Sequence, residues 1–497
     1  MPDRSSGGVP ADGTPGRHGQ MGADPRRWKA LTVCLIAGFV TWLDISIVNV
    51  ALPSIRVALD APPSALQWVV SGYAFAFGLL LVPAGRFGDT HGRRNVFLFG
   101  AALFALASAA AGAAPESSWL ITARVVQGAA AGVIAPQVTG LIQQLFQGAE
   151  RGRAFGLLGA TMSISTAVGP LLGGLLIQFS GQREGWRHVL HVSIPISLIA
   201  MILAHRYIPG RPAGKRQRQR QRQRQRQRQR QRESMDPVGV LLLAAGVLLL
   251  ILPLVEGRAW PGQGKWLLIL AGAVVLTGFV GWEHWYGKRH DPIVDLSLFR
   301  RGSYALGTLL ALLYFGGFTA IFFIITQYLQ EGLHYSALRA GWVSAAFALG
   351  SALSAALGGR VVVRFGRPLV VFGLVLVTLG LGATEPATRL VSGQNAAWAI
   401  AAPLFVAGVG NGLIVSPNQT LTLSAVPVAE AGVAGGMLQM GQRIGASVGI
   451  AAVGSAHGIY AASFQQALLV NIMFVLAALA AGVADVFVER RAVRRPG

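Results

Sequence analysis

Three charged residues, Asp44, Arg124 and Arg443, interrupt stretches of the chain that are otherwise apolar enough to predict membrane-spanning helices. A charge at the centre of a membrane helix costs about 2.5 to 3.5 kcal/mol even on a lenient scale, so such charges usually face a bundle interior or a wet cavity. Burial favours the neutral form of a carboxyl group, so Asp44 could exchange a proton near working pH. The alternative is a permanent ion pair in which Asp44 and Arg124 hold two helices together.

Glycines accompany both arginines. Arg124 shares one helix face with Gly128 and Gly132, a spacing that predicts close contact with a neighbouring helix. A second seam with this spacing is formed by Gly441, Gly445 and Gly449. Arg443 points away from that seam, which favours a position beside a cavity. For Arg124, attachment to backbone carbonyls is the alternative to pairing with the acid.

The composition predicts the helices that must position these charges. Of the 497 residues, 53% are hydrophobic and only 12% are charged, whereas soluble domains carry about 25% charged residues. An all-α polytopic membrane protein is therefore expected. Fourteen stretches of membrane-crossing length lie near residues 30–52, 66–84, 95–113, 118–140, 154–178, 188–205, 238–255, 266–282, 304–329, 340–358, 368–384, 396–426, 431–457 and 464–484.

Basic residues indicate the orientation of these helices. Most of the 42 Lys and Arg residues fall in loops and tails on the side of residue 1, which predicts that both termini are cytoplasmic. The preference for Arg over Lys is typical of GC-rich bacteria, so a bacterial inner membrane is expected. The expected parts are a disordered N-terminus (1–27), a six-helix half (28–207), a disordered linker (208–237), two additional helices (238–285), a second six-helix half (286–487) and a tail (488–497).

One short motif occurs twice. The segments "GRFGDTHGRR" from Gly85 and "GRVVVRFGRP" from Gly359 both follow the pattern GRx5GR and begin 274 residues apart. Repetition of helical halves is typical of transporters, whose substrate site lies between the halves near the membrane midplane. The spacing suits six helices plus two extra spans and a linker.

These motifs resemble those of the major facilitator superfamily. "GRFGDTHGRR" is similar to its motif A, "RVVQGAAAGVIAPQ" from Arg124 to motif B, and "GPLLGG" from Gly169 to the antiporter motif C. "LDISIVNVALPSI" resembles the first-helix motif of the drug:proton antiporters with fourteen helices. The resemblance implies the major facilitator fold, with two six-helix halves and two linking helices. Thr90 departs from motif A, where a basic residue is common.

The resemblance also implies roles for residues. Asp44 would carry the proton and Arg124 would be its partner. In motif A, Gly85 and Gly92 would permit a tight turn, and Asp89 would pair with Arg93 or cap a neighbouring helix as a conformational latch. The second copy carries Val363 in place of that acid, so the latch is expected on one side only.

Motif C supplies a proline inside a helix. Pro170 removes an amide and is expected to kink the helix, while Gly169, Gly173 and Gly174 would permit close packing. The resemblance implies a hinge or seal that prevents leakage in an exchanger. Ordinary helix packing is the alternative.

An aromatic stripe is the candidate substrate surface. Tyr314, Phe318 and Phe322 recur at steps of four residues and could stack on flat, cationic or amphipathic compounds. Contact with lipid is the alternative. Further candidate lining residues are Gln327, Asn49 and Tyr73.

The tract of alternating Arg and Gln at residues 215–233 contains no apolar residue and is expected to be a disordered linker that contacts anionic lipids. It carries no interleaved aromatic residue, which argues against nucleic-acid binding. The sequence has no phosphate-binding loop and no CxxC or HExxH arrangement. We therefore expect that the protein is not an enzyme and has no cofactor. An ion gradient is the expected energy source.

These observations predict a monomeric secondary transporter that exports small lipophilic or cationic drugs or antibiotics in exchange for protons. Two alternatives remain. A proton symporter could import a nutrient, although motif C and the first-helix motif argue against it by resemblance. A membrane-anchored sensor or scaffold could present the Arg/Gln tract to a partner, but it would not explain the three intramembrane charges.

Overall fold

The computed structural model describes residues 26–209, 236–255, 264–288, 290, 292–329, 333, 335, 337–390, 396–455 and 461–493. Within these residues the chain forms fourteen α-helices and two short 3-10 helices, and no strand. The Arg/Gln tract at 215–233, most of the expected N-terminus at 1–27 and the end of the tail at 494–497 lie outside the described residues.

The helices follow the apolar stretches of the sequence closely. The first group comprises α1 (Arg26–Ala58), α2 (Pro63–His91), α3 (Arg93–Gly112), α4 (Ser117–Leu145), α5 (Gly148–His191) and α6 (Ser193–Tyr207). Two helices follow, α8 (Pro237–Val255) and α9 (Lys265–Tyr286). The last group comprises η2 (Leu296–Arg300), α10 (Gly302–Gln327), α11 (Ala337–Phe365), α12 (Arg367–Leu390), α13 (Ala396–Ser424), η5 (Val428–Glu430), α14 (Ala431–Ser455) and α15 (Ala461–Val493).

The structure supports a multi-pass membrane protein without confirming fourteen spans. Among the described residues, twelve helices are long and apolar enough to cross a membrane. The apolar part of α8 is shorter, and α14, which carries Arg443, is not among the twelve. The candidate spans contain more charges than the apolar stretches of the sequence. The helices run past the apolar stretches, so Asp89, Glu283 and Asp485 also belong to candidate spans.

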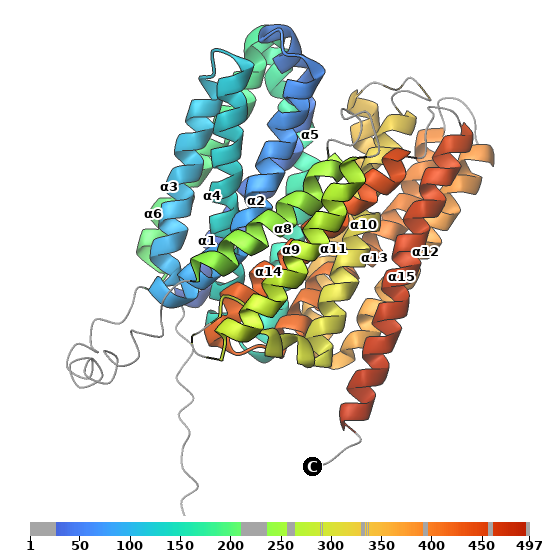
Figure 1. Cartoon of the computed structure of the whole chain (residues 1–497). Coiled ribbons are helices and arrows are strands. Elements are labelled where there is room, and N and C mark those ends of the chain that lie inside the picture. The colour runs from blue at the N-terminus through green and yellow to red at the C-terminus, as the bar shows by residue number, and fades with distance from the viewer. Residues whose placement is uncertain are drawn as a thin grey trace, which may run out of the picture.

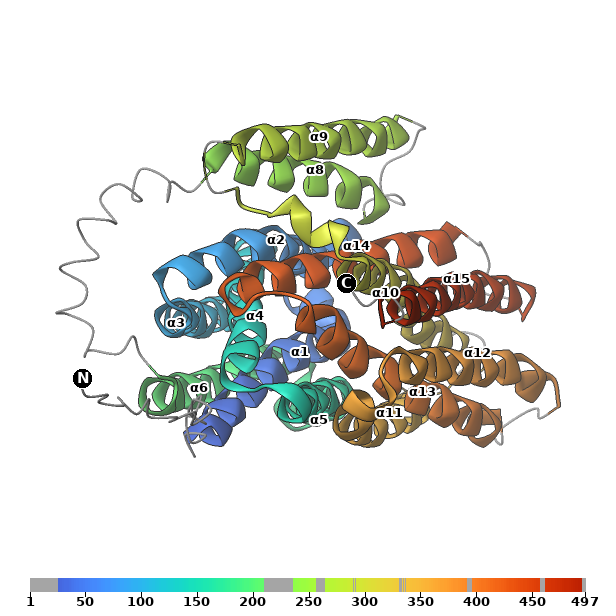
Figure 2. The same ribbon diagram turned by 90° about the horizontal axis from the view of Figure 1, so that it is seen from below.

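The first six helices gather on one side of the molecule, and most of the last six gather on the other (Figures 1 and 2). The two groups contact each other through two helix pairs, α5 with α11 and α2 with α14. Helices α8 and α9 form a peripheral pair, with α8 against α2 and α14 (Figure 2). We call the end of the molecule at which α1 begins and α2 ends the base.

Glycine stripes allow the closest helix contacts. A methyl group at Gly128 would collide with the carbonyl oxygen of Tyr73, and one at Gly132 would lie 2.5 Å from that of Phe77. The predicted close contact beside Arg124 is therefore confirmed as the packing of α4 on α2. The second seam packs α14 on α10, since a methyl group at Gly445 would collide with the carbonyl of Leu312.

Candidate functional site

Asp44 lies at the centre of a buried polar cluster in the first six helices. Its side chain is 0% exposed, and its two carboxyl oxygens accept hydrogen bonds from two residues of α4. Arg124 Nη1 donates to Oδ2 at 2.6 Å, and Gln127 Nε2 donates to Oδ1 at 2.7 Å. Gln127 also donates to the hydroxyl of Ser108 on α3 at 2.8 Å. The sequence analysis did not identify Gln127, the residue that links the acid to a third helix.

Arg124 is held by more than Asp44. Its Nη1 also donates to Gln127 Oε1 at 2.7 Å, and its Nε donates to the backbone carbonyl of Val69 at 3.2 Å. The guanidinium lies over the ring of Tyr73, 4.4 Å from the centroid. Arg124 therefore keeps partners if Asp44 becomes neutral. Tyr73, predicted to line a substrate site, belongs to this cluster.

Arg443 on α14 reaches the first six helices through aromatic rings. Its guanidinium lies 4.4 Å from the ring centroid of Phe77 and 5.0 Å from that of Trp42. Among the described residues it makes no ion pair with a carboxylate. Arg443 therefore lies beside Trp42, which lines the cavity described next.

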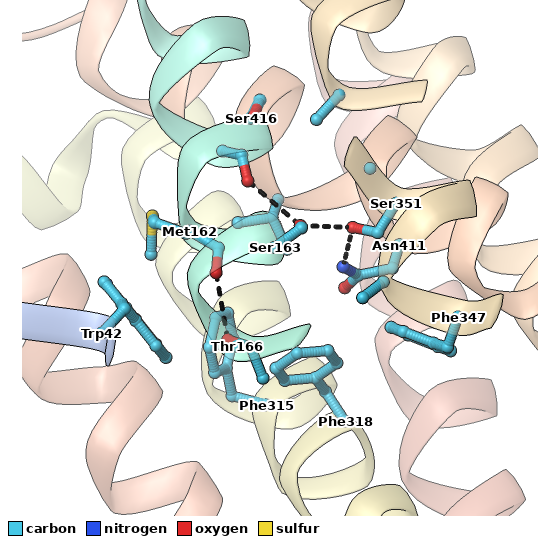
Figure 3. Close-up of a pocket in the computed structure, with 15 residues that line it drawn as sticks. Trp42, Met162, Ser163, Thr166, Phe315, Phe318, Phe347, Ser351, Asn411 and Ser416 are labelled. Atoms are coloured by element: carbon cyan, nitrogen blue, oxygen red, sulfur yellow. Dashed lines mark hydrogen bonds between the residues drawn. The ribbon is translucent and has the colours of Figure 1, made fainter. Parts of the chain in front are cut away.

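A cavity lies between the two groups of helices and is shown in Figure 3. It is lined by Trp42, Gly159, Met162, Ser163, Thr166, Phe315, Phe318, Phe347, Ala348, Ser351, Ala355, Asn411, Gly412, Val415 and Ser416. These residues come from α1, α5, α10, α11 and α13, and none of them is charged. The space open to a water-sized sphere is about 40 Å³, enough for a few waters but not for a drug-sized ligand. A ligand therefore requires the walls to separate.

A chain of hydrogen bonds crosses one wall of the cavity. The hydroxyl of Tyr314 donates to Asn411 Oδ1 at 2.6 Å, and Asn411 Nδ2 donates to Ser351 Oγ at 2.6 Å. Ser351 Oγ lies 2.8 Å from Ser163 Oγ, which joins α11 to α5 (Figure 3). The buried hydroxyl of Ser416 has no partner among the described residues, so it is available to a ligand.

The predicted substrate residues have different positions. Phe318 lines the cavity and stacks on Tyr314, with ring centroids 6.0 Å apart. Tyr314 is buried behind it. Asn49 is exposed, donates to the carbonyl of Ile45 at 3.3 Å and is not among the lining residues. The side chain of Gln327 lies outside the described residues.

The motif A residues join the two groups of helices at the base. Asp89 pairs with Arg93, whose Nη2 donates to Oδ1 at 2.6 Å. Asp89 also caps α14, because Oδ2 accepts hydrogen bonds from the amides of Gly432 at 3.0 Å and Val433 at 3.1 Å. Arg93 Nη2 also donates to the carbonyl of Val428 at 2.7 Å. An anion at a helix N-terminus is favourable, so Asp89 stabilises the closed base.

Two motif A glycines make this geometry possible. A methyl group at Gly85 would lie 2.5 Å from the carbonyl oxygen of Gly432, so α2 and α14 pack backbone to backbone. Gly92 has φ 105°, a conformation that favours glycine and lets α3 begin directly after α2. Glu430 lies nearby in η5. Burial is the main cause that raises its pKa, and the carboxylate of Asp295 raises it further.

The second copy of the motif uses a different acid. Arg367, the counterpart of Arg93, pairs with Asp485 of α15, with Nε and Oδ2 2.8 Å apart, and donates to Asn418 at 2.8 Å. No described residue of the first six helices takes part in these bonds. The acid missing at Val363 is replaced within the last six helices, which is consistent with a latch on one side only.

Motif C places α5 against α1. Pro170 lacks the amide that would bond the carbonyl of Thr166, and the hydroxyl of Ser46 on α1 donates to that carbonyl at 2.9 Å. Methyl groups at Gly169 and Gly173 would press on α1, at 2.6 Å from Ser46 Oγ and 2.9 Å from Ile47 Cγ1.

One expectation for motif C is wrong, and the kink at Pro170 stays a prediction. A methyl group at Gly174 would meet nothing within 4 Å, so this glycine does not serve close packing. Helical dihedral angles continue through Pro170, and the only departure in α5 is at Gly181, with φ 79° and ψ 160°. Because Ser46 satisfies the freed carbonyl, the helix passes Pro170 without a break in its backbone conformation.

The substitution Ser46→Ala is expected to lower the free energy of unfolding by about 0.6 to 1.7 kcal/mol, the range for hydrogen bonds between membrane helices. It leaves the carbonyl of Thr166 unpartnered. Thermal unfolding in detergent measures the effect. Thr122→Ala is the matched control, because its exposed hydroxyl bonds only the Ser118 carbonyl of its own helix. Equal midpoints for the two variants would contradict this role of Ser46.

Comparison with known proteins agrees with this architecture. The family model described as Major Facilitator Superfamily matches residues 34–450 and 307–496. The probable actinorhodin transporter of Streptomyces coelicolor is 34% identical over 465 residues, covering 91% of this chain and 77% of that protein. The puromycin resistance protein pur8 of Streptomyces alboniger is 32% identical over 442 residues, covering 86% and 82%.

Solved structures show the same fold at low identity. The bacterial proton:xylose symporter XylE has a TM-score of 0.63 at 15% identity, covering 93% of this chain and 95% of that one. The human organic anion transporter MFSD10 has a TM-score of 0.65 at 16% identity, covering 92% and 100%.

The fold and the cavity between two helix groups therefore define a membrane transporter. The chain belongs to the major facilitator superfamily, and its relatives include antibiotic and multidrug efflux transporters of that superfamily.

Proposed function

We propose that this protein exports antibiotics or related drugs across the bacterial inner membrane in exchange for protons. The relatives named for actinorhodin transport and puromycin resistance support the substrate type, and relatives named for the export of tetracenomycin C and cephamycin support the direction. The buried acid cluster supports proton coupling, and the cavity between the helix groups supports transport by alternating access.

The observation that carries the proposal is the set of partners around Asp44. A proton on Asp44 removes the negative charge that faces Arg124, and the guanidinium still has Gln127 Oε1, the carbonyl of Val69 and the ring of Tyr73. Neutralisation therefore leaves Arg124 hydrogen-bonded, which limits the cost of a buried cation that has lost its counter-ion. An acid whose cationic partner keeps other hydrogen bonds is suited to a proton carrier.

The cluster and the cavity share helix α1. Trp42 lines the cavity, Asp44 stands two positions later, and Ser46 bonds α5. Rotation of α1 when the Asp44 ion pair loosens would move Trp42 against Arg443 and the cavity wall. Protonation and substrate binding can thereby influence each other.

The cavity favours aromatic substrates that are uncharged or anionic. Trp42, Phe315, Phe318 and Phe347 offer stacking surfaces, while the polar lining residues offer hydrogen bonds. Arg443 lies beside Trp42, and a positive charge disfavours cations. The expected preference for cationic drugs is therefore replaced in this proposal.

The remaining features complete the transport cycle. We place the base at the cytoplasm, with both termini, and assign the closed contacts of Asp89 and Arg93 to the state that faces outward. Helices α1 to α6 and α10 to α15 act as the two halves that rock. We further propose that the protein acts as a monomer and that the tract at 215–233 contacts anionic lipids.

Reconstitution in proteoliposomes tests the proposal. A pH-sensitive dye enclosed in the vesicles reports proton movement when a panel of aromatic antibiotics, anionic or uncharged, is added, with lipophilic cations as the comparison. Proton flow opposite to the substrate is the expected result. Flow in the same direction as the substrate would identify a symporter, and no substrate-dependent flow would reject proton coupling.

A further inference from the structure

Two buried carboxyl groups lie on the additional helices, away from the Asp44 cluster. Asp236 precedes the first residue of α8, Glu283 lies in the last turn of α9, and each is 1% exposed. Burial of two acids in so small a region is costly unless their charge is compensated. The surroundings of each group therefore indicate what compensates them.

Asp236 is well satisfied. Its Oδ1 accepts the amide of Gly239 at 2.9 Å, which caps the first turn of α8, and its Oδ2 accepts the indole N–H of Trp282 at 2.6 Å. Both are donors that stabilise an acceptor oxygen. Trp282 adjoins Glu283 on α9, so this bond also joins the two additional helices.

Glu283 is only partly compensated. Neither of its carboxyl oxygens accepts a well-formed hydrogen bond from a described residue, although the backbone amides of Ile293 and Val294 lie close enough to favour its ionised form. The charged groups that face it are Asp236 and, from α2, Arg86. No ion pair joins Glu283 to Arg86 in the described part of the chain. An ionised Glu283 would thus be a buried and poorly compensated anion beside a second anion.

The two carboxyl groups border one small space. A methyl group at Gly239 would lie 2.6 Å from Asp236 Oδ2 and 2.8 Å from Glu283 Oε1. Only glycine leaves this space open. Two carboxylates that share a site cannot both ionise easily, and one proton between them converts repulsion into a hydrogen bond.

A proton fits this space better than a metal ion. The indole N–H of Trp282 points at Asp236 Oδ2, where a metal ion would have to bind. The described residues contain no group of three His, Cys, Asp or Glu side chains that could hold a metal. Divalent cations bind sites with several oxygen ligands, and this pair supplies too few.

We propose that Asp236 and Glu283 form a second proton-binding site, in which Glu283 carries the proton and the pair holds a single negative charge. The site assigns a role to α8 and α9 that is independent of the substrate cavity. It also adjoins the latch, because Arg86 faces both Glu283 and Glu430, and Glu430 in turn faces Asp89, Asp295 and Arg301. Loss of the proton would draw Arg86 toward α9.

Infrared difference spectroscopy of the full-length protein in nanodiscs tests the site. A protonated buried carboxyl group gives a C=O stretching band at a higher frequency than the bands of carboxylates, and this frequency shifts in D₂O. The Asp44→Asn background removes the proton assigned to the transport cycle. In that background Glu283→Gln is expected to remove one protonated-carboxyl band at neutral pH, and Glu184→Gln, which changes a largely exposed acid, is expected to leave it.

A second measurement keeps the proposal testable if Glu283→Gln folds poorly. A carboxyl group that keeps its proton in the folded state makes the protein less stable as pH rises toward the value at which the folded protein releases it. The otherwise unmodified protein should lose that part of its stability between mildly acidic and alkaline pH, and Asp236→Asn should weaken this dependence. Three results would each overturn the site. The first is a protonated-carboxyl band that persists in Glu283→Gln, and the second is a pH dependence of stability that is unchanged in Asp236→Asn. The third is a stabilisation by Mg²⁺ that Glu283→Gln abolishes.

Discussion

Replacing Asp44 with asparagine is expected to reduce transport driven by a pH gradient to the level of empty vesicles. Asparagine keeps the shape of the side chain and one acceptor oxygen, but it cannot bind or release a proton near neutral pH. Substrate exchange without a pH gradient should persist, because it needs the cavity and the rocking motion but no change of charge at Asp44. Both rates are measured on the same proteoliposomes.

The same variant separates proton coupling from a static ion pair. A permanent clasp would stabilise the fold through the ion pair itself, so its loss should lower the free energy of unfolding and the thermal midpoint. If Asp44 is a proton carrier, the thermal midpoint of Asp44→Asn stays close to the parent value, since Gln127 and the carbonyl of Val69 still hold Arg124. Glu184→Gln is the matched control, because its surface pair with Arg187 contributes little. Full gradient-driven transport by Asp44→Asn would exclude Asp44 as the carrier.

The helices could be predicted from apolar runs of membrane-crossing length, but their ends could not. Helix α15 runs to Val493, past the last apolar stretch, and this extension buries Asp485 against Arg367. A charge next to a predicted span end indicates a loop residue, so an ion pair was not expected there. Arg367, on α12, compensates the buried charge of Asp485, and this pairing depends on how α12 and α15 pack.

The candidate site divides in the same way. Asp44, Arg124 and Asp89 could be identified because a charge in an apolar stretch, or in a motif, stands out. Gln127 and Trp42 could not, because an uncharged polar side chain or a single tryptophan is common in membrane helices. Their importance depends on which helix faces them, and the sequence does not specify helix packing. The pairing of Asp236 with Glu283 could not be predicted either, because it depends on how the start of α8 packs against the end of α9.

Replacing Asp89 with asparagine is expected to open the base of the molecule. The substitution removes the charge that compensates Arg93 and that stabilises the N-terminus of α14. Arg93 keeps the carbonyls of Gly140 and Val428 as partners, so the cost lies below that of an orphaned buried charge, about 3 to 5 kcal/mol. A cost of about 1.4 kcal/mol already moves a two-state equilibrium tenfold. The cost falls on the closed state, because the bonds from Gly432 and Val433 to Asp89 join α2 to α14.

Distances between spin labels measure this opening. In a Cys34→Ala background, the exposed positions Asn95 on α3 and Phe487 on α15 are changed to cysteine and labelled near the base. Asp89→Asn should shift the distance distribution toward longer values. Glu150→Gln is the control, because its ion pair with Arg27 also lies at the base but joins α1 and α5 within the first helix group. A distribution that is identical in Asp89→Asn and the control would mean that the backbone packing of Gly85 on Gly432 is sufficient to hold the base closed without the charge.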